Sequence, residues 1–564
     1  MSEKHGGSSR SSRNTPDILS QSFDSDSSDT VDVDGMLAHV GNFGRFQLVL
    51  IALFSLINAL SAFHYFGQTF ISVEPQHACV IHPEDNLNNT LLTQIAYYNA
   101  DACKVTYKNE NHTPIAVEHC RHWEYNSSYG YVSLVQELNW VCDDAWKPAL
   151  GQSVFFVGSL IGSLGFGILA DRIGRLHVLV AANVCAFVGN FITIFANDAI
   201  TYGCARFVAG CATDTNFVMM YMIVMEYMKP SMRTAGLNLS IGVFYCVASM
   251  LVPWLAVLMH HWQYFLLAIS VPHLLVVLFY FAVPESAQWL ISKGRFDEAM
   301  RCFVRIAQTN NRRLDDKVGN QLRTYMKEHI KSEHSHASFL GLMKTPRLRR
   351  KTLILIFKSM VLSLCYDAIA RNINGFGYSP FLIFSATSAT IFPGCVVILL
   401  LQDRIGRKAL ASGSLFIGGV FISLVGVILS WDGADATLML ILTVLARLNV
   451  IVAFNSGHQY AFELIPTEVR AQGVSVIHVA GFAATFFSPQ ILYLAGWWRP
   501  LPEIIVGVLL ICGAGACLFL PETLARTLPV TLEDGELFGE DEGVFEFACF
   551  GNNLSESRNV LTKT

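Results

Sequence analysis

Long apolar segments recur along the chain. A segment of about 20 residues crosses roughly 30 Å of hydrocarbon as a helix, in which every backbone group is hydrogen-bonded internally. The pattern therefore predicts twelve membrane-spanning helices, at residues 46–68, 150–170, 177–197, 200–226, 234–258, 262–283, 352–373, 378–401, 409–431, 436–460, 471–495 and 500–520.

The composition agrees with this pattern. Hydrophobic residues make up 52% of the 564 residues and charged residues only 15%, which leaves too few charges for the surface of an ordinary soluble protein. The chain has no glycine-rich phosphate loop, no HExxH sequence and no paired CxxC sequences. The predicted fold class is an all-α membrane protein, and we expect no catalytic residue, cofactor or metal.

The distribution of charge predicts how the chain is threaded through the membrane. Residues 285–351 contain fifteen Lys or Arg residues, and such clusters stay on the cytosolic side. Residues 71–147 contain four basic residues against ten acidic ones, so we place them outside. Residues 1–45 contain ten serines and lack the apolar core of a signal peptide. They are expected to form a disordered cytosolic tail, and residues 522–564 a second cytosolic tail.

The predicted external segment carries sites for modification. Asn88, Asn111 and Asn126 each begin an Asn-x-Ser/Thr sequence, the acceptor of N-linked glycans in secreted regions. An oxidising exterior would also allow four cysteines to form two disulfides: Cys79, Cys103, Cys120 and Cys142. The three possible pairings stay open from the sequence alone.

An internal repeat gives the architecture. The letters Asp-Arg-Ile-Gly-Arg occur at 171–175, after the second predicted helix, and again at 403–407, after the eighth. Further echoes follow in the same order: Glu226 and Arg233 with Glu463 and Arg470, and Pro284-Glu285 with Pro521-Glu522. These pairs indicate two related six-helix halves, residues 46–284 and 352–521.

These motifs resemble those of the major facilitator superfamily, and within it solute carrier family 22, which contains organic cation, organic anion and carnitine transporters. The resemblance rests on the repeated motif, the cysteine-bearing external segment and three runs: Pro-Glu-Ser-Ala-Gln-Trp-Leu at 284–290, Glu-Leu-Ile-Pro-Thr at 463–467 and Leu-Pro-Glu-Thr at 520–523. Gln288 departs from the family pattern, which usually has Arg there. The resemblance implies the major facilitator fold, with twelve helices in two halves.

The resemblance also implies alternating access, in which the halves rock about a central site that opens to one side at a time. The charged motif residues lie at predicted cytosolic helix ends. We hypothesise that they form an ion-pair lock that holds the inner gate closed: Asp171, Arg175, Glu226, Arg233, Asp403, Arg407, Glu463 and Arg470. The alternative is that they only fix topology and helix packing.

Candidate substrate ligands are the polar and aromatic residues inside the predicted helices, because charge in hydrocarbon usually faces a cavity. Asp214, Phe217 and Tyr221 fall at i, i+3 and i+7, and therefore share one helical face. A carboxylate beside two rings suits an amine, through its charge and through cation–π contact. The alternative is an aspartate that pairs with a basic neighbour for structure alone.

The tenth and eleventh predicted helices supply a second group. Phe454, Asn455 and His458 share a face, and His478 enters from the next helix. A neutral imidazole and an amide can bind a polar substrate, although a histidine in a membrane is more often a packing residue that forms a hydrogen bond. In the seventh predicted helix, Tyr366 resembles a family tyrosine that contacts substrate.

Three charged or charge-selecting positions depart from the family pattern, which has Trp and Gly in place of Lys358 and Asp367. Asp367 and Arg371 are four residues apart and are interpreted as a local ion pair. Lys358 lies on the opposite side of the helix and needs another partner. The position that tends to be Asp in cation carriers and Arg in anion or carnitine carriers is Phe482, so the usual charge selector is missing.

Together these features predict a multi-pass plasma-membrane transporter, with both termini cytosolic, that carries a small organic cation or zwitterion. The alternatives are an organic anion transporter, and a non-transporting receptor or scaffold on a transporter fold. The expected partners are the substrate and the lipid bilayer, not nucleic acid, since the net charge is −5 and the basic residues sit beside the membrane. The sequence does not fix the oligomeric state.

Overall fold

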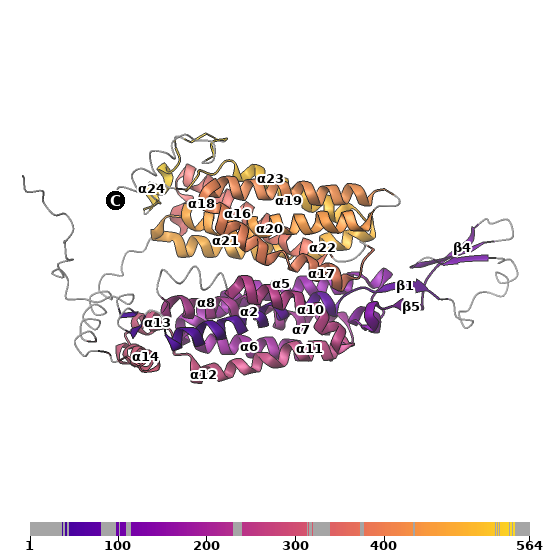
Figure 1. Cartoon of the computed structure of the whole chain (residues 1–564). Helices are drawn as coiled ribbons and strands as arrows, with labels where there is room; N and C mark the ends of the chain where they lie inside the picture. Colours follow the sequence, from indigo (N-terminus) through magenta and orange to yellow (C-terminus); the bar gives the residue numbers. More distant parts are fainter. Residues whose placement is uncertain are drawn as a thin grey trace, which may run out of the picture.

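The chain folds into a bundle of long helices that carries a small strand-bearing domain at one end, in a computed structural model (Figure 1). Among the residues described, eleven helices are long and apolar enough to cross a membrane, and the shorter α23 (Leu501–Cys517) takes the twelfth position that the sequence predicts. The structure describes residues 36–37, 40–41, 44–80, 97–100, 102–108, 114–228, 240–312, 314, 319, 339–372, 377–431, 435–524, 526, 528–529, 531–540, 542–543 and 545–547.

The N-terminal half contains six predicted spans, several of them broken into shorter helices. Its elements are α2 (Arg45–Ile71), α5 (Trp146–Ile173), α6 (Arg175–Thr193), α7 (Ala199–Cys211), α8 (Thr213–Tyr227), η3 (Ile241–Tyr245), α10 (Cys246–Met259), α11 (Trp262–Ser270), η4 (Val271–Leu278) and α12 (Phe279–Ala282). The break after α11 coincides with Pro272, which has no N–H to donate to the preceding turn. The break at Ala212 separates α7 from α8, so that Asp214 lies in the first turn of α8.

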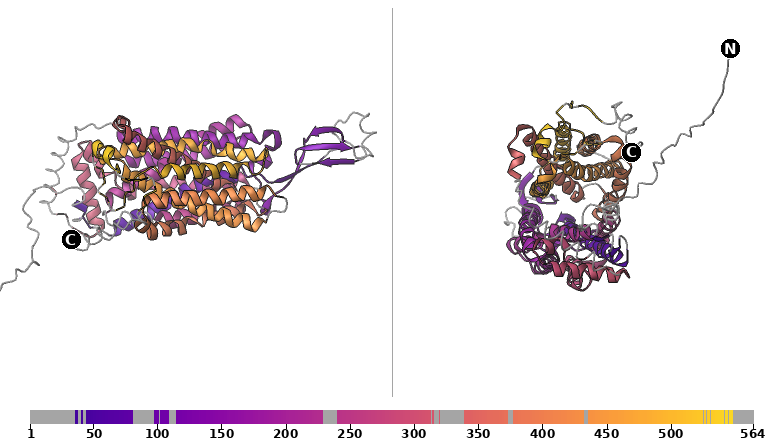
Figure 2. Two further views of the ribbon diagram at one scale, coloured as in Figure 1. Left: turned by 90° about the horizontal axis from the view of Figure 1, so that it is seen from above. Right: turned by 90° about the vertical axis from the view of Figure 1, so that its left-hand side faces the viewer.

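The C-terminal half repeats this arrangement beside the first half (Figures 1 and 2). Its elements are α16 (Pro346–Arg371), α17 (Pro380–Ser388), α18 (Ile391–Ile405), α19 (Arg407–Leu429), α20 (Ala436–Leu464), η6 (Thr467–Val469), α21 (Arg470–Thr485), α22 (Ser488–Tyr493), η7 (Leu494–Gly496) and α23. Large apolar side chains remain exposed on the outside of both halves, for example Phe281 and Leu399. Lipid is the environment that suits such a surface.

The strand-bearing domain lies between α2 and α5 in the sequence and projects from one end of the bundle (Figure 2). It contains an antiparallel pair, β1 (Gln76–Cys79) with β5 (Trp123–Asn126), and a second antiparallel sheet of β2 (Tyr97–Ala100), β3 (Lys104–Lys108) and β4 (Pro114–His119). Three short helices, η1 (Ser128–Gly130), α4 (Leu134–Glu137) and η2 (Cys142–Asp144), lead back to α5. Asn126 is exposed at the end of β5, whereas Asn88 and Asn111 lie outside the described residues.

The opposite end of the bundle carries α13 (Ala287–Ser292), α14 (Phe296–Thr309), η5 (Phe339–Met343) and α24 (Leu532–Leu537). Just after α14, the Asn310 side chain accepts the Phe46 N–H (3.0 Å) at the start of α2 and donates to the Val40 carbonyl (3.3 Å). Met36, Leu37 and Val40 are buried in the N-terminal core. The described end of the predicted N-terminal tail is therefore packed on the bundle, which departs from the expectation of disorder, because its apolar residues find a surface to cover.

Candidate functional site

Asp214 is held in the N-terminal half without an ionic partner among the described residues. Its carboxylate accepts a hydrogen bond from the Ser159 hydroxyl of α5 (3.1 Å). The predicted alternative, a structural pair with a basic neighbour, is not found in the described part of the chain. The first turn of a helix is a favourable position for a negative charge, because the helix dipole is positive there. Within the described part of the chain, the carboxylate is thus supported by one hydroxyl donor and by its position in the first turn of α8.

The two aromatic residues of the same face lie against each other. The rings of Phe217 and Tyr221 are stacked with centroids 5.8 Å apart. Phe54 of α2 completes the group, with its ring centroid 5.9 Å from that of Phe217 and 6.2 Å from that of Tyr221. No sequence pattern distinguishes Phe54 from the many other phenylalanines. Phe217 and Tyr221 therefore belong to one aromatic cluster that is built from two helices.

The candidate residues of the C-terminal half form a continuous aromatic wall. Tyr366 of α16 contacts Phe454 of α20 (ring centroids 4.9 Å), and Phe454 contacts His458 (4.5 Å). His458 faces His478 of α21 (5.5 Å), which in turn contacts Phe482 (4.8 Å). Three helices thus join Tyr366 and Phe482, which were predicted separately, to the predicted group that contains Phe454, His458 and His478.

Asn455 does not join this wall through its amide. Its Nδ2 donates to the Ile451 carbonyl of the preceding turn (3.0 Å), and the side chain is exposed. One donor of the amide is therefore used by its own helix, because a side chain four residues on can reach that carbonyl.

Asp367 and Arg371 form the ion pair that their spacing predicts, with Nε and Oδ1 2.8 Å apart and both side chains buried. Both residues of the pair also have hydrogen-bond partners on other helices. Tyr65 of α2 donates to Asp367 (2.7 Å), and Ser488 of α22 donates to its other oxygen (2.7 Å). Arg371 also donates to Thr69 (2.7 Å). A predicted local pair is therefore a junction between the two halves.

Two buried cations of the C-terminal half have no carboxylate partner among the described residues. Lys358 donates to the Gly457 carbonyl (2.6 Å), which is the partner that the sequence left open. Arg447 of α20 is 1% exposed, donates to the Tyr366 carbonyl, and has its guanidinium 3.8 Å from the centre of the Tyr366 ring. We did not identify Arg447 from the sequence, although a charged residue within an apolar span was the signal that would have found it.

Hydrogen bonds and ring contacts between the halves gather toward the end that carries the strands. They include Ser153 to the Phe486 carbonyl (3.1 Å), Ser385 to the Met250 carbonyl (3.1 Å), and the rings of Phe66 and Phe384 (5.1 Å). The Asp367 and Arg371 junction belongs to the same region. The halves are thus tied together at the end that carries the strands.

At the opposite end, the predicted gate residues make contacts within their own half. In the N-terminal half, Glu226 accepts hydrogen bonds from the Ser286 hydroxyl (2.6 Å) and the Gln288 N–H (3.3 Å). The Arg175 guanidinium lies 3.4 Å from the same hydroxyl. Because the contact of residue 288 with Glu226 uses its backbone, the departure of Gln288 from the family pattern leaves this contact intact.

The C-terminal half has the corresponding cluster with direct ion pairs. Arg407 lies 3.2 Å from Glu463 and 3.0 Å from Asp403. The Thr523 hydroxyl also donates to Glu463. These pairs hold α18, α19 and α20 together at one end of the half.

Three predicted gate residues take little part in these clusters. The Asp171 side chain is exposed, although its backbone carbonyl accepts the indole N–H of Trp289 (3.0 Å). The Arg470 Nε donates to the Ile465 carbonyl (3.1 Å). Arg233 lies outside the described residues.

The glutamates of the Pro-Glu echoes have a role that the sequence reading did not assign. The Glu285 carboxylate accepts the backbone N–H groups of Arg175 (2.8 Å) and Leu176 (3.1 Å) at the start of α6. Gly174 precedes them with φ 108° and ψ 157°, a conformation that is essentially restricted to glycine. Glu285 thus caps α6 across a glycine turn.

The second copy uses the same device. Glu522 accepts the N–H groups of Arg407 (2.9 Å) and Lys408 (3.2 Å) at the start of α19, and Gly406 has φ 99° and ψ 158°. The repeat therefore preserves a carboxylate cap for one helix in each half, because an anion is stabilised by the exposed N–H groups at a helix start.

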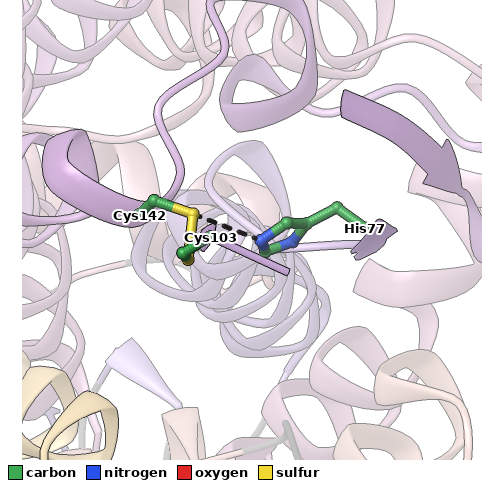
Figure 3. Close-up of side chains that lie close together, drawn as sticks. All are labelled: His77, Cys103 and Cys142. Carbon is green, nitrogen blue, oxygen red and sulfur yellow. Dashed lines mark hydrogen bonds between the residues drawn. A yellow bond between two sulfur atoms is a disulfide. The ribbon is translucent and has the colours of Figure 1, made fainter. Parts of the chain in front are cut away.

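The four cysteines between α2 and α5 form two disulfides, Cys79 with Cys120 and Cys103 with Cys142. His77 lies beside the second one, with its Nε2 3.8 Å from the Cys142 sulfur (Figure 3). The three side chains are close enough to surround an ion, but both sulfurs are bonded to each other and metals bind thiolates. The cluster is therefore a packing contact inside the strand-bearing domain.

Comparison with known proteins places the chain among transporters rather than enzymes. The sequence profile described as "Sugar (and other) transporter" matches residues 91–531. An organic cation transporter protein of Drosophila melanogaster is 29% identical, with 90% of this chain and 95% of the relative aligned. The human organic cation/carnitine transporter 2 is 28% identical, with 89% and 93% aligned.

Solved structures show the same fold. The xylose transporter XylE of E. coli, in its inward open conformation, superposes with a TM-score of 0.57 at 15% identity, covering 86% of this chain and 99% of XylE. This likeness confirms the major facilitator fold, and the relatives confirm the resemblance to solute carrier family 22. With a profile match over most of its length, the chain belongs to the sugar (and other) transporter family.

Proposed function

We propose that this transporter moves a small amine-bearing organic cation or zwitterion across the plasma membrane by alternating access, and that Asp214 receives the cationic group. The observation that carries the proposal is a carboxylate in an apolar span with a hydroxyl partner, Ser159, and no ionic one among the described residues. The names of the relatives, which include organic cation and organic cation/carnitine transporters, support the same substrate class.

The physical role of Asp214 is to offset desolvation. A cation that leaves water loses its hydration, and a carboxylate with neighbouring rings replaces part of it. Phe217, Tyr221 and Phe54 supply those rings. An inside-negative potential contributes about 2.3 kcal/mol per charge per 100 mV to entry of a cation, so the site has to lower the barrier rather than supply the driving force.

The buried cations of the C-terminal half favour a zwitterion over a simple cation. Lys358 and Arg447 place two positive charges in the C-terminal half, and the described residues offer them carbonyls and rings rather than carboxylates. A ligand with a carboxylate would be attracted to that side while its ammonium group is held by Asp214. His458 and His478 lie in the same half and can donate or accept hydrogen bonds.

The outer gate would be the junction of Asp367, Arg371 and their partners in α2, and the inner gate would be the two motif clusters. With the halves joined at the strand end and the motif ion pairs confined to single halves, the arrangement corresponds to a carrier open toward the end that bears α24. Closing that end would require the cluster of Arg175 and Glu226 to approach its counterpart.

The proposed orientation puts the strand-bearing domain outside the cell and both termini in the cytosol. The two disulfides suit an oxidising compartment, and Asn88, Asn111 and Asn126 would carry glycans there. Treatment of the protein from mammalian cells with an N-glycosidase should increase its mobility on a gel. Unchanged mobility would contradict the glycans.

The function is tested by uptake of labelled solutes into cells that display the chain. A panel of a cation, a zwitterion and an anion of similar size should show saturable uptake of one of the first two. Asp214→Asn keeps the side-chain shape and removes the charge. It should weaken apparent affinity by about tenfold or more, since a hydrogen bond to a charged group contributes about 1.5–3 kcal/mol.

Asp198→Asn is the matched control. Asp198 caps α7 where the span that contains Asp214 begins. Its carboxylate accepts the N–H groups of Ile200 and Thr201 (3.3 and 3.4 Å), a task that asparagine also performs. Uptake by this variant should be unchanged. Saturable uptake of the anion alone would support the organic anion alternative, and no uptake by a protein at the surface would support a receptor or scaffold.

A further inference from the structure

A basic pocket lies at the end of the C-terminal half that carries α24, away from the candidate substrate residues. It has a volume of about 240 Å³ and forms where α16 and α19 begin and α23 ends. Four cationic side chains line it, and two carboxylates, Glu540 and Glu542, face them. The four are Arg347, Arg350, Lys351 and Lys408. Among the lining side chains themselves, positive charges therefore exceed negative charges by two, while Glu522 and Glu546 act on Lys408, and Glu536 on Lys351, from outside the lining.

The pocket is built on the boundary between a polar and an apolar surface. Lys408 is 1% exposed and forms part of its interior, with Nζ 3.3 Å from the Gly543 carbonyl. Arg350 lies at the rim, with its guanidinium 5.1 Å from the centre of the Phe519 ring. Phe519 is itself 51% exposed on the outside of the bundle. A ligand that fits would have an anionic head for the cations and an apolar part for the membrane side.

The chain already places its own anions on this surface. Residues 531–540 and 542–543, which we name the strap, include α24 and follow the last membrane helix in the sequence. Glu540 pairs with Arg347 (2.6 Å), and Glu536 accepts the N–H groups of Arg347 (3.0 Å) and Leu348 (2.6 Å) at the start of α16. Lys351 donates to the Gly535 carbonyl of the strap (2.9 Å). The strap shows that the site accepts carboxylates and leaves Arg350 without a carboxylate among the described residues.

We propose that this pocket binds the phosphomonoester headgroup of an anionic membrane lipid, with the strap as its cover. A phosphomonoester carries a charge of about −1.5 to −2 at neutral pH, so it would pair with Arg350 and would compete with Glu540 for Arg347. Arginine and lysine donors suit its three oxygens. The pocket lies at helix ends on the side of the bundle that the proposed function places in the cytosol, where anionic lipids are concentrated.

A lipid bound in this pocket would be connected to the predicted inner gate by a short segment of the chain. Pro521 lines the pocket and precedes Glu522, the carboxylate that caps α19. Gly539 of the strap packs against Pro521, where an added Cβ would collide with its ring. A lipid held here is therefore expected to stabilise the end of the C-terminal half that contains Arg407.

The test uses the full-length protein in uncharged detergent and measures the thermal midpoint against added ligand. The probes are a short-chain phosphatidylinositol phosphate, phosphatidylinositol without the added phosphate, phosphatidylserine, a soluble inositol phosphate and inorganic phosphate. We expect the thermal midpoint to increase saturably with the first probe and to increase much less with each of the others. An equal response to phosphatidylserine or phosphatidylinositol would overturn the phosphomonoester, and an equal response to inositol phosphate or inorganic phosphate would overturn the lipid.

Arg350→Gln should weaken binding of the first probe by about tenfold. Arg349→Gln is the matched control, because Arg349 is an exposed neighbour on α16 that does not line the pocket, and it should bind as the unaltered protein does. Glu540→Gln removes a competing carboxylate and should tighten binding several-fold. Equal weakening by Arg349→Gln, or weaker binding by Glu540→Gln, would contradict the site.

The assay contains no transport substrate. Asp214→Asn should therefore bind the lipid normally, and a failure of the proposed transport function would leave this result unaffected. Conversely, an absence of saturable binding in the unaltered protein would overturn the lipid site without touching the assignment of Asp214.

Discussion

At the residue scale, the charged side chains inside the bundle differ in how many partners they have among the described residues. Asp367 has an arginine and two hydroxyl donors, so its charge is compensated on every side. Asp214 has one hydroxyl donor. A buried carboxylate with a full set of partners holds structure together, whereas one with an incomplete set attracts a cationic ligand. This difference separates the proposed gate residue from the proposed substrate residue.

The Asp367 junction makes a prediction about stability. Asp367→Asn leaves Arg371 buried without its counter-charge, and breaking such a pair costs about 3–5 kcal/mol. The thermal midpoint of the purified protein should fall sharply. The double variant Asp367→Asn, Arg371→Gln leaves no buried charge without a partner, so its thermal midpoint should be higher than that of Asp367→Asn. If the double variant is less stable than the sum of the single variants predicts, the two residues do not act as a pair.

At the element scale, each half starts one helix from a glycine turn that a distant glutamate caps. The turn places the N–H groups of Arg175 and Leu176 against Glu285, 110 and 109 residues away in sequence. The cap therefore joins the start of α6 to the segment that follows α12. The local sequence sets the glycine turn, but the carboxylate that caps the helix comes from the end of the half.

A pair of glycine substitutions tests this device. Gly174→Ala would put a methyl group against the Glu285 carboxylate and force a conformation that costs a non-glycine residue about 1–3 kcal/mol. Gly167→Ala, in the preceding helix α5, meets open space and should be tolerated. We expect a lower thermal midpoint and lower surface expression for the first variant only. Equal behaviour of the two variants would contradict the capped turn.

At the scale of the whole molecule, the two halves are tied at the strand end. The Ser153 hydroxyl of α5 accepts from the Gln490 amide of α22 (2.6 Å), and it donates to the Phe486 carbonyl. If the halves rock during transport, these contacts must break in every cycle, because the site has to open to the strand side. A covalent bond at this position should therefore stop the cycle.

The double variant Ser153→Cys, Gln490→Cys should cross-link under oxidation and lose uptake, and a reducing agent should restore it. A protease site placed within residues 321–338 reports the cross-link, because the cleaved halves then stay together on a gel unless reduced. Each single cysteine variant should keep its uptake under oxidation. Full uptake by a quantitatively cross-linked protein would exclude opening at this end.

The sequence by itself determined the membrane spans, the two-fold repeat and the presence of cysteines for two disulfides. It could do so because a helix in lipid requires a long apolar segment, and because the internal repeat appears as recurring sequence motifs. Residue spacing along one helix also predicted the Asp367 and Arg371 pair and the shared face of Phe217 and Tyr221. These contacts lie within about two turns of a helix, so local geometry fixes them.

Only the tertiary structure decided which residues meet across helices. It paired Cys79 with Cys120, gave Lys358 the Gly457 carbonyl, and added Phe54 and Arg447 to the candidate site. It also drew Glu285 and Glu522 to helix starts more than a hundred residues away. Such contacts depend on how separate helices pack against each other, and the packing of helices is a property of the whole chain that spacing within one segment does not encode.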